Sequence, residues 1–162
     1  MTTPSPFRVL FVCMGNICRS PAGDNVFRHL VAEAGLAGQI GCDSAGTLGY
    51  HAGKAPDRRM TAALEARGIP VSGAARQFRT GDFGRFDLIL TMDEDNRREV
   101  RDLARNDDER RKVRPFTSFC GTFDDQEVPD PYYGGTRGFE LVADMIEDGC
   151  AGLLDHVRDR IK

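Results

Sequence analysis

The sequence lacks any apolar run long enough to cross a membrane, which takes about 20 consecutive apolar residues in a helix. Its first residues, MTTPSPF, also lack the basic region followed by an apolar core that marks a secretory signal. The net charge is −3, and there is no basic stripe interleaved with aromatic residues, as a nucleic-acid-binding surface would require. We therefore expect a cytoplasmic protein with no membrane and no nucleic-acid partner.

Metal-binding spacing is also missing. The three histidines lie far apart, and the cysteines are odd in number and irregularly spaced, at Cys13, Cys18, Cys42, Cys120 and Cys150. Structural zinc sites use closely spaced pairs of such residues, and a disulfide framework in a secreted protein would favour an even number. We expect reduced thiols, no metal and no other cofactor.

What the chain does have is the stretch VLFVCMGNICRSP, residues 9–21. Val9–Val12 form a continuous apolar run typical of a strand buried on both faces. A helix can begin at Ser20, with Pro21 suited to its first position. A strand that turns tightly into a helix directs several backbone N–H groups and a positive dipole end at one point. The stretch therefore predicts a phosphate-sized anion site.

A thiol opens this loop and a guanidinium closes it, at Cys13 and Arg19. A nucleotide-binding loop of the Walker type would need a lysine, which is absent. Cysteines at helix N-termini favour the thiolate form, and an arginine can bind two phosphate oxygens at once. The loop could therefore hold a phosphate monoester over a nucleophilic thiolate. The alternative is that Cys13 is a buried structural cysteine.

Expulsion of an alkoxide or phenolate from phosphorus needs a proton donor, for which Asp130 is the candidate. It lies between Pro129 and Pro131, which stiffen the local backbone. A bound phosphate would favour the protonated form that can donate. The alternative is an ordinary turn residue, since Asp-Pro is common in turns.

Apolar patterns along the chain alternate between strand and helix. Strands are predicted at 9–12, 40–45, 86–90 and, as an edge strand, 113–116, and helical spacing follows Ser20, Met60, Asp93 and Phe139. The charged segment 97–114 indicates a solvated helix face, and 117–138 a functional loop. This order predicts an α/β fold, a single domain of residues 7–162 after a flexible tail of residues 1–6, with a parallel sheet and helices on both faces. Ligands of such sheets bind at the carboxyl ends of the strands, where Cys13 lies.

The segment CMGNICRSP resembles the signature loop of the low-molecular-weight protein tyrosine phosphatases. The resemblance continues, in family order, at Ser44–Thr47, Ala75–Gln77, Met92–Asn96 and Asp130–Gly134. It implies a flavodoxin-like, four-stranded parallel sheet and cofactor-free hydrolysis of phosphotyrosine in protein substrates, with a tyrosine kinase as one candidate. We expect a monomer or a weak dimer.

The resemblance also implies roles for particular residues. Cys13 would form a phosphocysteine, Arg19 would bind phosphate, and Asp130 would act as general acid and then base. Ser20 would donate a hydrogen bond to the Cys13 sulfur, although a helix cap is its alternative role. The remaining residues of the phosphate-binding loop would be Met14, Gly15, Asn16, Ile17 and Cys18.

Four further roles follow from the same resemblance. Asn16 would hold the shape of the loop, with Ser44 behind it. Cys18 would pair with Cys13 in a reversible disulfide that protects against peroxide, or it is a plain buried cysteine. Aromatic walls of a deep substrate cleft would come from Tyr50, Tyr132 and Tyr133, for which packing is the alternative.

Two positions depart from the family pattern. Gly23 stands in the first turn of the predicted helix, where glycine costs about 0.5–1 kcal/mol. Gly73 stands where the family often has a histidine, so one hydrogen-bonding partner of the loop is expected to be missing. Neither change touches Cys13, Arg19 or Asp130.

Three other functions compete with phosphotyrosine hydrolysis. A thioredoxin-coupled arsenate reductase would need more cysteines after the third strand, and residues 91–105 contain none. A protein-arginine phosphatase would have threonine in place of Ile17. A phosphoprotein-binding module without turnover is disfavoured by the intact Cys13, Arg19 and Asp130.

Overall fold

The computed structural model describes residues 5–132 and 135–162. The predicted tail therefore falls mostly outside the described residues, as does Tyr133, and the boundary at residue 7 stays a prediction. The strands are β1 (Phe7–Cys13), β2 (Ile40–Gly46), β3 (Leu88–Thr91) and β4 (Val113–Pro115). The helices are α1 (Arg19–Glu33), α2 (Arg58–Glu65), α3 (Asp82–Arg85), α4 (Glu94–Leu103), α5 (Asp107–Lys112) and α6 (Thr136–Arg160), with a 3₁₀ turn η1 (Phe116–Phe119).

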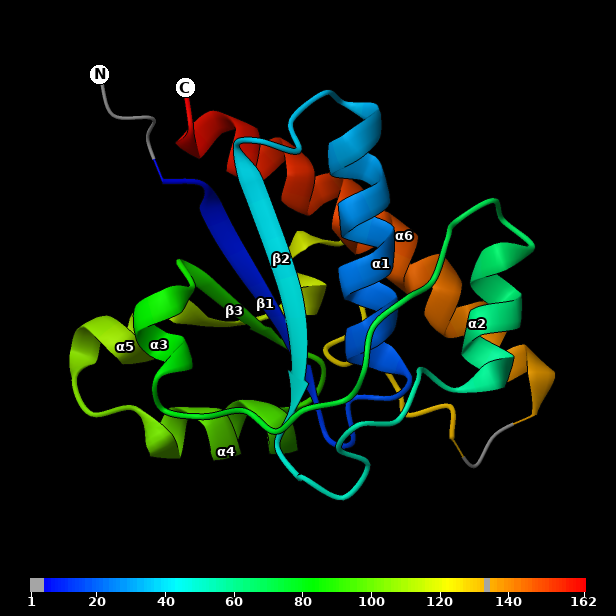
Figure 1. The fold of residues 1–162 in the computed structure, drawn as a ribbon, viewed down its shortest axis with the longest axis horizontal. Coiled ribbons are helices and arrows are strands. Elements are labelled where there is room, and N and C mark those ends of the chain that lie inside the picture. The colour runs from blue at the N-terminus through cyan, green and yellow to red at the C-terminus, as the bar shows by residue number, and fades with distance from the viewer. Residues whose placement is uncertain (1–4, 133–134) are drawn as a thin grey trace.

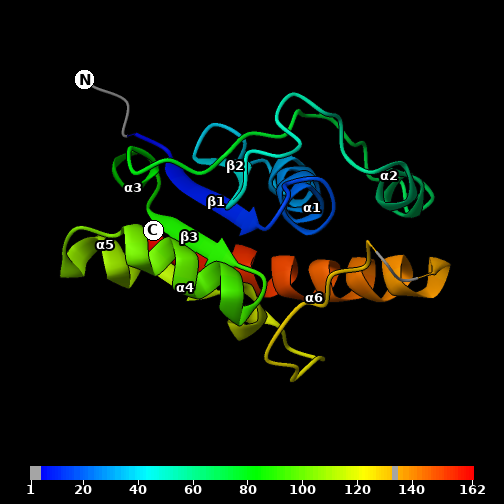
Figure 2. The ribbon, with the colours of Figure 1, turned by 90° about the horizontal axis from the view of Figure 1, so that it is seen from below.

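The four strands form one parallel sheet in the order β2-β1-β3-β4. The arrowheads of β1 and β3 point the same way in Figure 2. Cys13 pairs with Gly46, and Val12 pairs with Thr91, so the ends of the three strands lie together. The prediction of a parallel four-stranded sheet, with its fourth strand at an edge, is confirmed.

Helices cover both faces of the sheet, as expected. Figure 1 shows α1, α2 and α6 on one side and α3, α4 and α5 on the other. Alternate residues of β1 serve the two faces because side chains of a strand point up and down in turn. Val9 and Phe11 belong to the core with α1 and α6, whereas Leu10 and Val12 belong to the core with α3 and α4. The strand is therefore apolar throughout.

Helix α1 begins one residue earlier than the sequence predicts. The carbonyl of Cys18 accepts the first helical hydrogen bond, from the N–H of Ala22 at 3.1 Å, so Cys18 occupies the cap position. Pro21 is consequently not the first helical residue, and Ser20 is not a cap; its hydroxyl contacts Cys13 instead. The other end of α1 is followed by Gly35, whose positive φ of 73° is typical of the glycine that terminates a helix.

Gly23 is explained by the close approach of α1 to the sheet. A Cβ atom at this position would lie 2.5 Å from Cδ1 of Phe11, a side chain that is itself fully buried between the two elements. The sequence predicted only the conformational cost of this glycine. The structure shows that the glycine makes room for Phe11, under the helix whose N-terminus faces the loop.

We expect Gly23→Ala to destabilise the protein by about 1–3 kcal/mol, because overpacking outweighs the gain in helix propensity. Gly138→Ala in the first turn of α6 is the matched control, since its Cβ would make an ordinary 3.7 Å contact with Pro131. Urea unfolding of both variants gives the measurement. Equal stability of the two variants would contradict the packing argument.

The charged segment 97–114, which was interpreted as a solvated helix face, forms parts of two helices whose residues from 97 to 112 are exposed or half-buried except Val100. It divides at Ala104–Asn106 into α4 and α5, because the Asn106 side chain accepts a hydrogen bond from the Glu109 N–H and starts a new helix. The short helix α3 was not predicted. No helix in the described part of the chain is long and apolar enough to cross a membrane.

Candidate active site

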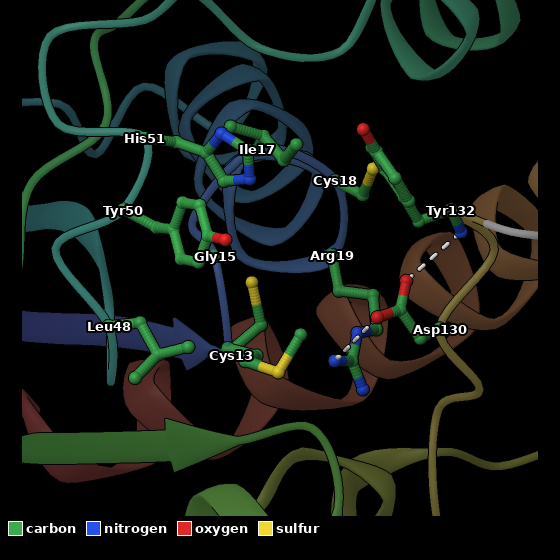
Figure 3. Close-up of a pocket in the computed structure, with 11 residues that line it drawn as sticks. Cys13, Gly15, Ile17, Cys18, Arg19, Leu48, Tyr50, His51, Asp130 and Tyr132 are labelled. Atoms are coloured by element: carbon green, nitrogen blue, oxygen red, sulfur yellow. Dashed lines mark hydrogen bonds and ion pairs between the residues drawn. The ribbon is translucent and has the colours of Figure 1, made fainter.

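A pocket of about 230 Å³ opens at the carboxyl end of β1 (Figure 3). It is formed by the loop after β1, the segment after β2 and the segment before α6. The residues that line it are Cys13, Met14, Gly15, Ile17, Cys18, Arg19, Leu48, Tyr50, His51, Asp130 and Tyr132. The pocket therefore brings together most of the residues that the sequence predicted.

The loop between β1 and α1 is held in an unusual conformation at Asn16. This residue has a φ of 57°, in the left-handed region that asparagine tolerates better than most residues, and it is almost fully buried. Its Nδ2 donates to the hydroxyls of Ser20 at 2.8 Å and Ser44 at 2.9 Å. Its Oδ1 accepts from the backbone N–H of Arg76 at 2.9 Å. The amide therefore joins the loop to two other segments.

The hydrogen bonds of Asn16 bear on the departure from the family pattern at Gly73. Asn16 uses both hydrogens of its amide group and its carbonyl oxygen, so the absent histidine leaves no gap in these contacts. Gly73 itself has a φ of 113° and open space around it. The expected loss of a hydrogen-bonding partner at Gly73 therefore does not fall on the Asn16 side chain.

The Cys13 thiol lies at the floor of the pocket with 3% of the residue exposed. Its Sγ is 3.0 Å from Oγ of Ser20. The Ser20 oxygen already accepts a bond from Asn16, so its own hydrogen can point to the sulfur or to the Ala45 carbonyl, 3.2 Å away. The hydroxyl can therefore stabilise negative charge on Cys13.

Arg19 is buried beside the Cys13 thiol, and its guanidinium is bound by groups from two other segments of the chain. Its Nη1 donates to Oδ2 of Asp93 at 2.5 Å and to the Val128 carbonyl at 3.1 Å. Burial by itself would lower the pKa of Arg19, but the nearby Cys13 and the Asp93 carboxylate raise it above its usual value. The guanidinium thus stays charged and fixed in orientation. Neither Asp93 nor Val128 was predicted as a partner from the sequence, although Asp93 stands two residues after the third strand.

Asp130 approaches the site from the segment before α6. Its Oδ2 is 3.6 Å from Nη2 of Arg19, and its Oδ1 accepts from the Tyr132 N–H at 3.0 Å. A third of its side chain is exposed. Figure 3 shows the carboxylate across the pocket from Cys13. It is therefore placed to exchange a proton with a ligand and with water.

Cys18 is a second, free thiol in the same pocket. Burial raises its pKa far above the usual value, and the negative charges of Asp57, Cys13 and Asp130 act in the same direction. Cys18 therefore remains protonated.

The walls of the pocket are partly aromatic. Tyr50 is 81% exposed and Tyr132 is 37% exposed, so both stand at the mouth rather than in the core. Leu48 and His51, which the sequence analysis missed, belong to the same wall as Tyr50, and the ring of His51 packs near Gly15. Their proximity to Tyr50 in the loop after the second strand was the available signal.

The residues described here contain no group of His, Cys, Asp and Glu side chains arranged to hold a metal ion. The groups that do converge in the pocket are the thiol of Cys13, the buried guanidinium of Arg19 and the carboxylate of Asp130. Together they can bind a phosphate monoester and supply a nucleophile and a proton. The fold and the pocket thus define an α/β protein with a cysteine-based phosphate site.

Comparisons with known proteins agree with this class. Residues 8–162 match the family model described as low molecular weight phosphotyrosine protein phosphatase, and the chain belongs to that family. A relative from Synechocystis sp. is 52% identical over 147 residues, which cover 91% of this chain and 94% of that protein.

Solved structures show the same fold. A protein tyrosine phosphatase from Entamoeba histolytica superposes with a TM-score of 0.92 at 40% identity, over 95% of this chain and 98% of that one. An arginine phosphatase from Drosophila superposes with a TM-score of 0.85 at 31% identity, over 93% and 97%. The two matches carry different activities on one fold, so the substrate must be argued from the pocket.

Proposed function

We propose that this protein hydrolyses phosphotyrosine in protein substrates through a phosphocysteine intermediate on Cys13. The observation that carries the proposal is the position of the buried Cys13 sulfur, 3.0 Å from the Ser20 hydroxyl, in one pocket with Arg19 and Asp130. No other cluster in the described residues combines a nucleophile, a phosphate-binding cation and a proton donor.

In the first step the Cys13 thiolate attacks phosphorus in line with the ester oxygen. The S–P bond forms as the P–O bond breaks, and protonated Asp130 gives its proton to the departing phenolate oxygen. Arg19 and the N–H groups of the loop hold the other phosphate oxygens, and their charge stabilises the transition state. The bond from Asp93 keeps the guanidinium turned toward the pocket.

In the second step a water molecule attacks phosphorus and the S–P bond breaks. Asp130, now ionised, takes the proton of that water, and inorganic phosphate is released. The sulfur leaves as a thiolate, which the Ser20 hydroxyl stabilises by donating a hydrogen bond. No redox step and no cofactor enters this scheme.

The depth of the thiol supports phosphotyrosine as the substrate. Cys13 is buried below the exposed rings of Tyr50 and Tyr132, so a phosphate on a long aromatic side chain can reach it, whereas a short phosphoserine cannot. Ile17 lines the same pocket and presents an apolar surface to an aromatic ring. This favours phosphotyrosine over phosphoarginine, the substrate suggested by the Drosophila match.

Cys18 extends the proposal to oxidation. Peroxide would convert the Cys13 thiolate to a sulfenic acid, and the Cys18 thiol would displace water from it to form a disulfide. The shared pocket and the protonated state of Cys18 support this order of events. A thiol reductant would restore both groups.

Hydrolysis of para-nitrophenyl phosphate and of matched peptides tests the substrate. We expect vanadate-sensitive turnover that is best in mild acid, unaffected by chelators, and at least about 100-fold faster for phosphotyrosine than for phosphoserine peptides, as a pocket that places only one phosphate against the nucleophile would give. A phosphoarginine peptide should also react more slowly. Binding of phosphate without any turnover would instead support a phosphoprotein-binding module.

A further inference from the structure

The orientation of the Asn16 amide decides what the neighbouring hydroxyl can do. A side-chain amide can present either its NH₂ or its oxygen to a given neighbour, and the surrounding hydrogen bonds choose between them. Here the backbone N–H of Arg76 donates to Oδ1, so the NH₂ group must face Ser20 and Ser44. Because Ser20 then accepts a bond from Asn16, its own hydrogen is available for the Cys13 sulfur at 3.0 Å, with the Ala45 carbonyl at 3.2 Å as the other acceptor.

The segment that supplies this N–H is tied to the end of β2. The Arg76 carbonyl accepts from the Gly46 N–H at 2.9 Å, and the Phe78 N–H donates to the Gly46 carbonyl at 2.7 Å. Gln77 consequently forms a bridge with Gly46, next to the strand end that faces Cys13. In Figure 1 this coil passes the arrowhead of β2.

The side chain of Arg76 anchors the segment from the other side. Its Nη1 and Nη2 donate to the two carboxylate oxygens of Asp82 at 3.0 and 3.1 Å, and its Nε donates to Asp43 at 3.2 Å. Asp82 is only 2% exposed, at the start of α3. This bidentate contact with a buried carboxylate fixes the position and the orientation of the Arg76 guanidinium. Arg76 therefore joins α3 and β2 to the loop.

We propose that Arg76 is a positioning residue for catalysis, which acts by holding its own N–H against Asn16 and thereby directs the Ser20 hydroxyl to Cys13. The inference rests on the proposed function, because it assigns a role within the same site. If the Arg76 segment shifts, its N–H no longer holds Oδ1 of Asn16, and the side-chain amide of Asn16 can turn over so that its oxygen and NH₂ exchange places. Its oxygen then takes the Ser20 hydrogen, and the sulfur loses its donor. The step in which sulfur leaves phosphorus slows most.

The test compares Arg76→Gln with Arg67→Gln. Arg67 is the matched control, because it is also a partly buried arginine with several carboxylate partners, Glu140, Asp144 and Glu147, and it lies outside the pocket. Both changes remove an ion-paired guanidinium and lower stability. Only Arg76→Gln is expected to lower the kcat for para-nitrophenyl phosphate, by about tenfold, as one lost hydrogen bond would.

Rapid-mixing kinetics identifies whether Arg76→Gln slows the formation or the hydrolysis of the phosphocysteine. We expect Arg76→Gln to release a larger initial burst of para-nitrophenolate than the wild type, because the phosphocysteine breaks down more slowly than it forms. Asn16→Ala should show the same burst, and adding Arg76→Gln to it should change little, since both act through one contact. A general loss of packing would not enlarge the burst, and it would not make the effects of Asn16→Ala and Arg76→Gln non-additive.

Phosphate affinity, measured by calorimetry, separates this inference from the proposed function. Inorganic phosphate should bind several-fold more weakly to Arg76→Gln than to Arg67→Gln, whether or not the protein turns over. A wild type that binds phosphate without turnover would overturn the proposed function alone. A folded Arg76→Gln that matches Arg67→Gln in burst and phosphate affinity would overturn the role of Arg76. Asp82→Asn, which removes the charged partner, gives the same comparison where Arg76→Gln does not fold.

Discussion

Replacing Cys13 with serine is expected to abolish hydrolysis of para-nitrophenyl phosphate, with a loss of roughly 10⁴-fold or more, as for other removed nucleophiles. A serine hydroxyl keeps the size of the side chain but is un-ionised near neutral pH, and this site supplies no general base within the contacts of Cys13. The loop, Arg19 and the contacts of Asn16 remain, so inorganic phosphate should still bind.

Steady-state turnover and calorimetric phosphate binding measure these two effects separately. Cys120→Ser is the control, because this half-buried thiol contacts the Met145 carbonyl outside the pocket and should retain full turnover. Substantial hydrolysis by Cys13→Ser would exclude a phosphocysteine intermediate. Loss of phosphate binding as well as turnover would mean that the thiol is needed to shape the loop.

Replacing Asp130 with alanine is expected to lower kcat by about 10²–10⁴-fold, the usual contribution of general acid catalysis. The loss should be larger for phenyl phosphate than for para-nitrophenyl phosphate, because the more basic phenolate depends more on a donated proton.

Asp124→Ala is the matched control, since this exposed aspartate lies in the same segment before α6 and is not part of the pocket. The ratio of rates for the two esters, measured across the pH range, distinguishes proton donation from an effect on binding. Equal losses for both esters with an unchanged pH profile would assign Asp130 an electrostatic role through Arg19, 3.6 Å away.

The fold class follows from the sequence because its signals are local. The alternation of short apolar strands with helical spacing predicts a parallel sheet with helices on both faces, and the sheet has this form. The proximity of Cys13, Arg19 and Ser20 is equally local, since seven positions separate the thiol from the hydroxyl that contacts it. A strand that turns into a helix over so few residues leaves little freedom in where these groups meet.

Such local signals do not predict contacts between segments that lie far apart in the sequence. Asp93 could be identified from the sequence only as the start of a helix, and it does cap α4 through Oδ1. Its Oδ2 binds Arg19, 74 positions earlier, which depends on β3 lying beside β1. The same carboxylate has two roles, and only the second involves the site.

Gly23 and Gly73, the two positions that depart from the family pattern, also separate what the sequence determines from what the tertiary structure decides. The sequence alone determined that Gly23 and Gly73 differ from the family pattern and what each costs locally. Only the tertiary structure decided that Phe11 fills the space above Gly23 and that the Arg76 N–H, 60 positions from Asn16, completes the bonds of the loop. Local sequence sets backbone conformation and periodicity, whereas the partners of a buried polar group are set by which elements the sheet order places side by side.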